Sequence, residues 1–198
     1  MQDSVRSKKM KIKKLPPLDY LNECFELSEE SSALLWKIRP RSHFPTSRGH
    51  ARTNAQFARK SAGTLWTNPL TGKQYCRIRI AGSVYHAHRI IYSMFHSVEL
   101  SIDTEIDHED NNGLNNSPTN LRVATHGENQ HNESLRKNNT SGVKGVNWHK
   151  ASSMWQGRVM FNSKTYNLGL SPTKKVMEEI VKEFREKLHR EFTNHGNV

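Results

Sequence analysis

The chain has 198 residues, of which 34% are hydrophobic. This is enough to bury a core, as two or three small modules rather than one large domain. The net charge of +11 indicates a polyanionic partner, most often nucleic acid, with an acidic membrane surface or plain solubility as the other interpretations. No apolar run approaches the ~20 residues that span a bilayer, and no apolar signal region follows the basic N-terminus. We therefore expect a cytoplasmic protein without a membrane partner.

The charges are unevenly distributed along the chain. No Asp or Glu occurs between Ser31 and Val98, whereas this stretch holds eleven basic residues. A second acid-free stretch runs from Ser134 to Met177. Between the two, six carboxylates crowd into the twelve residues from 99 to 110. The pattern indicates phosphate-binding flanks around a cation site, and an acidic surface loop is the alternative for such a cluster.

The N-terminal region begins with a basic flexible tail over residues 1–16. Apolar residues at helical spacing then predict a helix from Leu18 to Leu35, with Asp19 as its N-cap. Residues 40–64 show no periodicity and predict a loop that orders on a ligand. Cys24 and Cys76 lie far apart and form no CxxC pair, which argues against a disulfide framework and a zinc ribbon.

A hairpin and a short helix are predicted next. The strands are Gln74–Ile80 and Val84–Ala87. Arg77 and Arg79 share one face of the first strand, opposite its apolar residues, so we expect both side chains to face solvent and to meet phosphates. Apolar residues at helical spacing predict a helix over His88–Phe95, packed on the hairpin.

The centre of the chain predicts strand, loop, strand and helix in quick succession. Strands at Glu105–His108 and Leu121–Ala124 flank an Asn-rich turn. Thr125 and Glu128 form a capping box, so a helix starts there and runs to about Arg136. A unit this small buries little apolar area, so core packing alone does not account for the presence of these elements.

The C-terminal residues predict three strands and a closing helix. The strands are Val143–His149, Trp155–Phe161 and Thr165–Leu170. Ser171 and Pro172 are expected as the N-cap and first residue of the helix. Its inner face is marked by Met177, Ile180, Val181, Phe184, Leu188 and Phe192. The chain as a whole is expected to have an α+β fold built from small modules.

The central unit carries a motif that reads Ile106-Asp107-His108, Asn120-Leu121-Arg122 and Glu128-Asn129. Residue types, spacing and the strand-loop-strand-helix context together resemble the HNH, or ββα-metal, nucleases. The resemblance is greatest to the homing endonucleases of phages and mobile introns, and it covers residues 70–136. Taken alone, an Asp-His pair is usually structural, so the inference rests on this combination. No Walker A motif occurs, and no nucleotide cofactor is expected.

The resemblance implies roles for the motif residues. His108 is the general base that deprotonates the attacking water, and Asn120 orients it. Asp107 and Asn129 are the implied ligands of one Mg²⁺ or Mn²⁺ ion per site, because carboxylate and amide oxygens are hard donors. Many relatives have His where this chain has Asn129, so zinc is disfavoured. His131 and Asn132 are close enough in sequence to be alternatives for this third site residue.

The C-terminal module contains Gly145-Val146-Asn147-Trp148, Trp155-Gln156-Gly157-Arg158-Val159 and Leu168-Gly169, followed by the closing helix. In these segments it resembles the Apetala-type, or ethylene-response-factor, DNA-binding domain. It implies a three-stranded sheet in the major groove, with arginine reading guanine and lysine binding phosphate. The alternative for either tryptophan is a place in the core. The residues expected to contact DNA are Arg77, Arg79, Arg89, Arg122, Lys144, Trp148, Lys150, Trp155, Arg158 and Lys164.

We expect four parts in total. They are the basic tail at 1–16, a DNA-contacting α/β region at 17–100, the HNH nuclease motif at 101–137 and an Apetala-like DNA-binding domain at 138–198. Together they predict a metal-dependent, site-directed endonuclease of phage origin, acting in the bacterial cytoplasm. We expect it to bind double-stranded DNA as a monomer and to nick it, leaving 5′-phosphate and 3′-hydroxyl ends. The alternatives are a non-catalytic, sequence-specific DNA-binding regulator with an idle HNH motif, and a non-specific or restriction-type nuclease.

Overall fold

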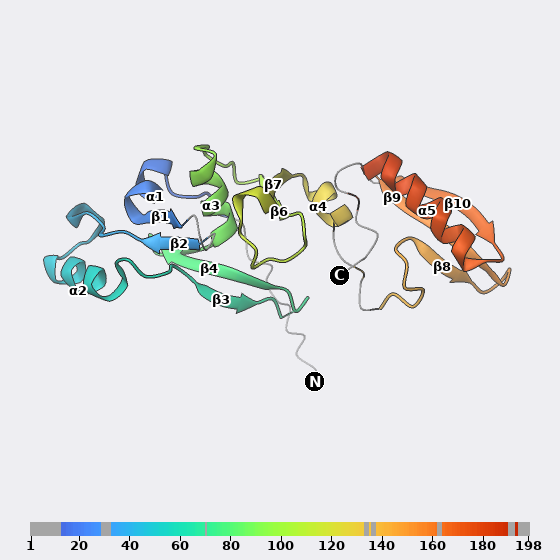
Figure 1. The fold of residues 1–198 in the computed structure, drawn as a ribbon, viewed down its shortest axis with the longest axis horizontal. Coiled ribbons are helices and arrows are strands. Elements are labelled where there is room, and N and C mark those ends of the chain that lie inside the picture. Colours follow the sequence, from blue (N-terminus) through green and yellow to red (C-terminus); the bar gives the residue numbers. More distant parts are fainter. Residues whose placement is uncertain are drawn as a thin grey trace, which may run out of the picture. The chain divides into compact units, whose positions relative to one another are not determined.

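The computed structural model describes residues 13–28, 33–69, 71–132, 135, 138–161, 164–189 and 193. Helices and small sheets are both present, so the fold belongs to the α+β class (Figure 1). The chain forms two compact units, one of residues 1–106 and 113–121 and the other of residues 107–112 and 122–198. Most of the predicted basic tail falls outside the described residues. None of the helices within them has the length and apolarity needed to cross a membrane.

The first unit begins with a helix and a hairpin rather than with one long helix. Helix α1 spans only Leu18–Cys24, and strands β1 (Phe25–Ser28) and β2 (Ala33–Trp36) pair antiparallel. The prediction of a helix up to Leu35 is therefore wrong beyond Cys24. Burial alternates along β2 with the period of a strand, and this period prevails over the helical spacing of the residues before it. Asp19 lies within the first turn and is not the N-cap, a position held by Pro17 without a side-chain hydrogen bond.

The predicted loop at residues 40–64 is also wrong. It contains the short 3-10 helix η1 (Arg41–His43) and the eleven-residue helix α2 (Ser47–Phe57). Thr46 caps α2, because its hydroxyl accepts a hydrogen bond from the Gly49 amide at 3.1 Å. No residue of α2 is buried, so the helix leaves no apolar periodicity in the sequence.

A three-stranded antiparallel sheet and helix α3 complete most of this unit. The strands are β3 (Thr64–Thr67), β4 (Gln74–Ile80) and β5 (Ser83–His86), in the order β3-β4-β5. The turn between β4 and β5 has positive φ angles, as the hairpin prediction requires. Helix α3 (Ala87–Phe95) follows directly. The apolar core of the unit combines residues of α1, the hairpin, β4 and α3 with Ile106 and Leu121.

The central strands and helix have the predicted order. Strand β6 spans Glu105–His108, the 3-10 helix η2 spans Pro118–Asn120, and β7 spans Leu121–Ala124. Strands β6 and β7 form a two-stranded sheet. Helix α4 spans His126–Asn132, and its expected continuation to Arg136 runs into residues outside the described part.

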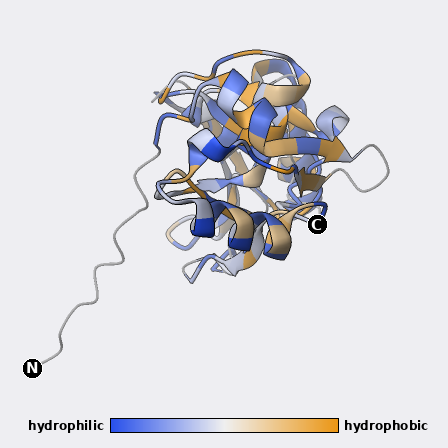
Figure 2. Ribbon diagram, turned by 90° about the vertical axis from the view of Figure 1, so that its left-hand side faces the viewer, coloured by the Kyte–Doolittle hydropathy of each residue, from blue (hydrophilic) through white to orange (hydrophobic). Residues whose placement is uncertain are grey.

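The C-terminal part of the second unit is a three-stranded antiparallel sheet with one helix. The strands are β8 (Val146–His149), β9 (Met154–Phe161) and β10 (Lys164–Ser171), in the order β10-β9-β8. Helix α5 (Lys174–His189) packs on them. The core of this part consists of Val143, Val146, Val159, Met177 and Val181. Most helices and strands carry both hydrophilic and hydrophobic residues, as expected for elements with one face on a core (Figure 2).

Two details of helix α5 differ from expectation. The helix begins at Lys174 rather than at Pro172, because the Ser171 hydroxyl accepts a hydrogen bond from the Thr173 amide at 3.1 Å and forms a turn before the helix. Ile180 is 39% exposed, so it contributes less to the inner face than predicted. Phe192 lies outside the described residues.

Candidate active site

Strand β6 places two adjacent polar residues in the interior of the protein. Asp107 and His108 are each only 6% exposed, as is the preceding Ile106, which belongs to the apolar core. Neighbouring residues of a strand point to opposite faces, so both faces of β6 are covered. Burying two ionisable side chains in succession is costly unless polar partners surround them.

The Asp107 carboxylate is held by two partners. Its Oδ2 atom accepts hydrogen bonds from Arg122 Nη2 at 3.1 Å, Arg122 Nε at 3.2 Å and Asn132 Nδ2 at 2.8 Å. Among the described residues, every hydrogen bond to this carboxylate ends on Oδ2. Burial raises the pKa of Asp107, and the contacts with Arg122 and Asn132 oppose that rise. Of the hydrogen bonds and ion pairs that the described residues make, none involves the other oxygen, Oδ1.

Asn132, on helix α4, is the most buried polar residue around β6, with 3% exposure. Besides Asp107, its Nδ2 donates to the carbonyl oxygen of His108 at 2.9 Å. Its Oδ1 accepts a hydrogen bond from Asn111 Nδ2 at 3.2 Å. One side-chain amide thus ties α4 to both β6 and the loop that follows it.

Arg122, on strand β7, faces the carboxylates. Its side chain is 16% exposed and pairs with Asp107 at 3.1 Å and with Glu109 at 3.3 Å. Arg122 is among the residues that the sequence predicts to contact DNA. In the structure its guanidinium compensates the charge of a buried carboxylate.

The loop between β6 and β7 is shaped by its asparagines. Asn111 adopts a positive φ of 60°, a conformation that Asn tolerates better than most residues, and its amide donates to the His108 carbonyl at 3.0 Å. Asn120, the residue predicted to orient His108, donates from Nδ2 to the Asn115 carbonyl at 2.8 Å. Gly113 is required sterically, because a Cβ there would lie 2.4 Å from the Gln74 carbonyl oxygen.

Helix α4 begins with the predicted capping box. The Glu128 carboxylate accepts from the Thr125 amide at 2.8 Å, and the Thr125 hydroxyl accepts from the Glu128 amide at 3.3 Å. Asn129 lies three residues before Asn132 and therefore on the same face of the helix, the face directed at Asp107. The side chain of His131, an alternative third site residue, is outside the described part of the structure.

The donors at this site suit a hard cation. Mg²⁺ is usually held by one or two carboxylates, with waters and substrate phosphate completing its shell, so Asp107 with an amide oxygen is a sufficient protein contribution. Zinc sites take three or four nitrogen, sulfur or carboxylate ligands. In the described ranges no group of three or more His, Cys, Asp or Glu is placed to hold a metal ion. Asp107 and a neighbouring amide oxygen are donors of the kind that a hard divalent cation accepts.

The three basic residues predicted to contact DNA from the first unit differ in their exposure. Arg79 is exposed, as expected. Arg77 stacks on the Trp66 ring, with its Cζ 3.1 Å from the ring centroid. Arg89 is 6% exposed and donates to the carbonyls of Ser101 and Thr104, so it binds the protein's own loop. Of the three, only Arg79 reaches freely into solvent.

The C-terminal sheet separates the predicted contacts by strand face. Arg158 is exposed on the face of β9 opposite Gly157 and Val159, which pack towards α5. Trp155 lies on the α5 side, packs on the apolar core and meets the Trp148 ring edge-on at 5.2 Å. Trp148 itself is 48% exposed. Of the predicted lysines, Lys150 and Lys164 are exposed and Lys144 is half-buried.

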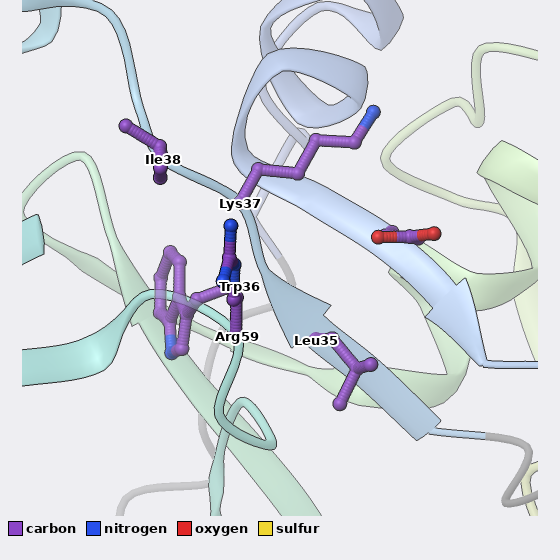
Figure 3. Close-up of a pocket in the computed structure, with 6 residues that line it drawn as sticks. Leu35, Trp36, Lys37, Ile38 and Arg59 are labelled. Carbon is purple, nitrogen blue, oxygen red and sulfur yellow. The ribbon is translucent and has the colours of Figure 1, made fainter.

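A separate hollow in the first unit offers different chemistry. It is lined by Glu26, Leu35, Trp36, Lys37, Ile38 and Arg59 (Figure 3). Lys37 Nζ donates to the Asn22 carbonyl at 2.9 Å. This lining holds no imidazole, so it does not offer the adjacent imidazole and carboxylate that β6 carries.

Two residues at the site make contacts that the sequence analysis did not predict. Asn132 holds Asp107, and Glu109 shares Arg122 with it. The signal for Asn132 was its three-residue spacing from Asn129, which places two amides on one helix face. No signal in the sequence distinguished Glu109 from the other carboxylates nearby.

Comparisons with known proteins agree with this geometry. The family model of the HNH endonucleases matches residues 85–131, a range that includes β6, the Asn-rich loop, β7 and nearly all of α4. The chain thus carries an HNH endonuclease domain. HNH nucleases generally use a divalent metal ion.

Two viral proteins are similar over longer stretches. Protein 3.8 of Escherichia phage T7 is 41% identical over 87 residues, which cover 44% of this chain and 71% of that protein. An uncharacterized HNH endonuclease, L560, of Acanthamoeba polyphaga mimivirus is 35% identical over 105 residues, covering 53% of this chain and 54% of that protein. The chain belongs to the same family as Protein 3.8. No solved structure matches significantly.

Proposed function

We propose that the protein is a metal-dependent DNA endonuclease that hydrolyses phosphodiester bonds and leaves 5′-phosphate and 3′-hydroxyl ends. The observation that carries the proposal is the buried pair Asp107 and His108 on β6, with the Asp107 carboxylate fixed by Arg122 and Asn132. Three separate elements are thereby used to position one carboxylate. Ionisable groups whose burial is costly in free energy are typical of functional sites.

His108 is the proposed general base. An imidazole titrates close to neutral pH, so it accepts a proton from water and later releases it. The strand and the Asn132 contact fix the backbone of His108, since Asn132 donates to the His108 carbonyl oxygen. Asn120 is proposed to orient the imidazole, and its own side chain is anchored to the loop through Asn115.

Asp107 and Asn129 are the proposed metal-holding residues. The Arg122 and Asn132 contacts occupy Oδ2 of Asp107, so Oδ1 is the oxygen that would hold the ion. Asn129 lies one turn before Asn132 on the same helix face, which supports its role as the second donor. A bound divalent ion would supply charge neutralisation at the phosphate and assistance to the departing 3′ oxygen.

The flanking parts are proposed to hold the duplex. The exposed Arg158 on the outer face of the C-terminal sheet and Arg79 on β4 are the clearest candidates among the predicted contacts. One active site per chain cleaves one strand at a time, so we propose that a monomer nicks double-stranded DNA. A homing-type role, directed at a specific site, is the corresponding biological proposal.

Cleavage of supercoiled plasmid in Mg²⁺ or Mn²⁺ tests the activity. The wild type should convert supercoiled into open-circular DNA, and His108→Ala should abolish this conversion. His96→Ala is the matched control, because His96 is exposed and lies outside the site. DNA ligase should reseal the nicks, since it requires the proposed end groups. Binding without metal-dependent cleavage in the wild type would support a DNA-binding regulator instead.

The role of the C-terminal sheet has its own test. Arg158→Ala should weaken binding to a target site more than binding to random DNA, because arginine in the groove reads bases. Lys150→Ala should weaken both equally and flatten the salt dependence, as expected for a phosphate contact. Equal losses on both DNAs for Arg158→Ala would argue against base readout by this face.

A further inference from the structure

Helix α2 (Ser47–Phe57) is a surface helix that buries none of its residues. A surface helix of a globular protein normally buries an apolar stripe, and that stripe is what holds it in place. In Figure 1, α2 lies at the edge of the first unit. Its presence as a formed helix therefore needs a different explanation.

Polar contacts from one face hold α2 in a defined orientation. Asn54 Oδ1 accepts from the Arg39 amide at 3.1 Å, and Asn54 Nδ2 donates to the Arg39 carbonyl at 3.0 Å. His50 Nε2 lies 3.0 Å from the same carbonyl oxygen. The Arg39 guanidinium in turn packs over the Trp36 ring at 4.5 Å and the Phe44 ring at 4.8 Å. The helix is thus anchored mainly through a neighbouring stretch of backbone, and Phe57 at its end also meets the ring of the core residue Trp36 at 6.5 Å.

The opposite face of α2 combines arginines with small residues. Arg48, Ala51, Arg52, Ala55 and Gln56 are all exposed, and their spacing places them on one side of the helix. Within the described part of the chain, neither arginine forms a hydrogen bond or ion pair. No Asp or Glu occurs anywhere between positions 31 and 98, so no acidic neighbour in this stretch neutralises them.

We propose that this outer face of α2 docks in the major groove of duplex DNA and reads bases there. The groove admits an α-helix, and the two alanines allow the helix backbone to approach its floor. Arginine pairs with guanine and glutamine with adenine, so the side chains that flank the alanines are suited to readout. The inference rests on the proposed function, in that DNA is the ligand.

The surroundings of α2 favour DNA over other polyanions. Arg41, Arg59 and Lys60 are exposed before and after the helix, where they supply charge for the phosphate backbone. The major groove of duplex RNA is too narrow for side chains to read. Protein interfaces are enriched in aromatic residues and depleted in alanine, whereas this face has two alanines and no aromatic side chain.

The first test compares charge removal at two helices of the full-length protein. Binding is measured in EDTA, where cleavage is suppressed, to a pool of duplexes with a randomised core. Arg48→Ala/Arg52→Ala should lower affinity by about 10-fold or more and reduce the salt slope. Lys182→Ala/Lys187→Ala removes the same charge from exposed positions of α5 and should change affinity by less than about 2-fold. Equal effects of the two double variants would overturn the proposal.

The second test separates groove docking from charge. Ala55→Leu adds bulk at an exposed helix position without changing charge, so it should leave the salt slope intact and reduce enrichment of preferred sequences from the randomised pool. Ala55→Ser keeps the residue small and should behave like the wild type. Unchanged enrichment in Ala55→Leu, or tighter wild-type binding to single strands or duplex RNA, would contradict docking in the DNA major groove.

The outcomes also separate this inference from the nuclease proposal. A wild type that binds duplexes through Arg48 and Arg52 but does not cleave them would remove the enzymatic function and leave the α2 assignment standing. If the arginine double variant kept metal-dependent nicking and unchanged DNA affinity, the α2 assignment would be lost and the nuclease proposal would stand. Circular dichroism should show little change in any of these variants, because no altered side chain is buried.

Discussion

The surroundings of β6 and the C-terminal sheet are stabilised in opposite ways. Around β6, the buried groups are Asp107, His108 and Asn132, joined by hydrogen bonds. The C-terminal sheet and α5 enclose valines and Met177 instead. Apolar packing tolerates small shifts of its members, whereas a buried polar network is favourable only when every member finds its partner. The polar network around β6 therefore holds a carboxylate rigidly at a cost in stability. The apolar core between the C-terminal sheet and α5 contributes to stability only.

The comparison predicts its largest effect for a polar residue introduced into the apolar core. Val181 is fully buried, and Val181→Asn would bury an amide without partners while losing apolar contacts. We expect a loss of about 3–5 kcal/mol in the free energy of unfolding of this region. Native-state hydrogen exchange of β9 and α5 in increasing urea measures it for this region. Val176→Asn, at a 46% exposed position of the same helix, should change stability by less than about 0.5 kcal/mol.

An apolar residue introduced into the polar network around β6 should also lower the free energy of unfolding, because hydrogen bonds are lost. Asn132→Leu keeps the branched shape but removes one donor from the His108 carbonyl, which retains the Asn111 amide, and one from Asp107, which retains Arg122, at a cost of about 2–3 kcal/mol. Hydrogen exchange of β6 and α4 should quicken, and DNA nicking should fall because the carboxylate is no longer fixed. Asn147→Leu, at an exposed position, is the control. A variant with normal protection and activity would show that the amide network is dispensable.

The sequence predicted the elements that carry a local signal. The capping box of Thr125 and Glu128, the β4-β5 turn and the bounds of β6 and β7 all depend on residues close together in the chain. Helix α2 was missed because its anchors are the backbone atoms of Arg39, which no periodicity records. The β1-β2 hairpin was missed because a short apolar run satisfies helix and strand spacing alike.

The candidate site, like the secondary structure, could be predicted only in part. The positions of Asp107 and His108 on a strand followed from the motif, and the structure buries both. Their chemical roles, and that of Asn129, stay predictions. The ion pair between Arg122 and Asp107 could not be predicted. In a basic protein, the partner of a basic residue can equally be a DNA phosphate or a carboxylate of the protein itself.

Removing the charge partner of Asp107 should have an intermediate effect. Arg122→Met keeps much of the side-chain volume but leaves a buried carboxylate with Asn132 alone, so we expect a loss of about 2 kcal/mol. In the Asp107→Asn background the same change should cost less, since no charge remains to be compensated. A double-mutant cycle on unfolding free energies measures the difference. Additive effects would mean that Arg122 stabilises β7 independently of Asp107.

The smallest effect is expected at the cap of helix α4. Thr125→Ala removes the hydroxyl that accepts from the Glu128 amide, and N-cap substitutions of this kind cost about 1 kcal/mol. Because α4 is short and is held at Asn132 by polar contacts, the loss should appear as faster hydrogen exchange within α4 and a modest drop in nicking rate. Thr125→Ser retains the hydroxyl and should restore both. If Thr125→Ala leaves exchange in α4 unchanged, the Asn132 network alone fixes the helix, and the contrast between the polar and apolar regions becomes sharper.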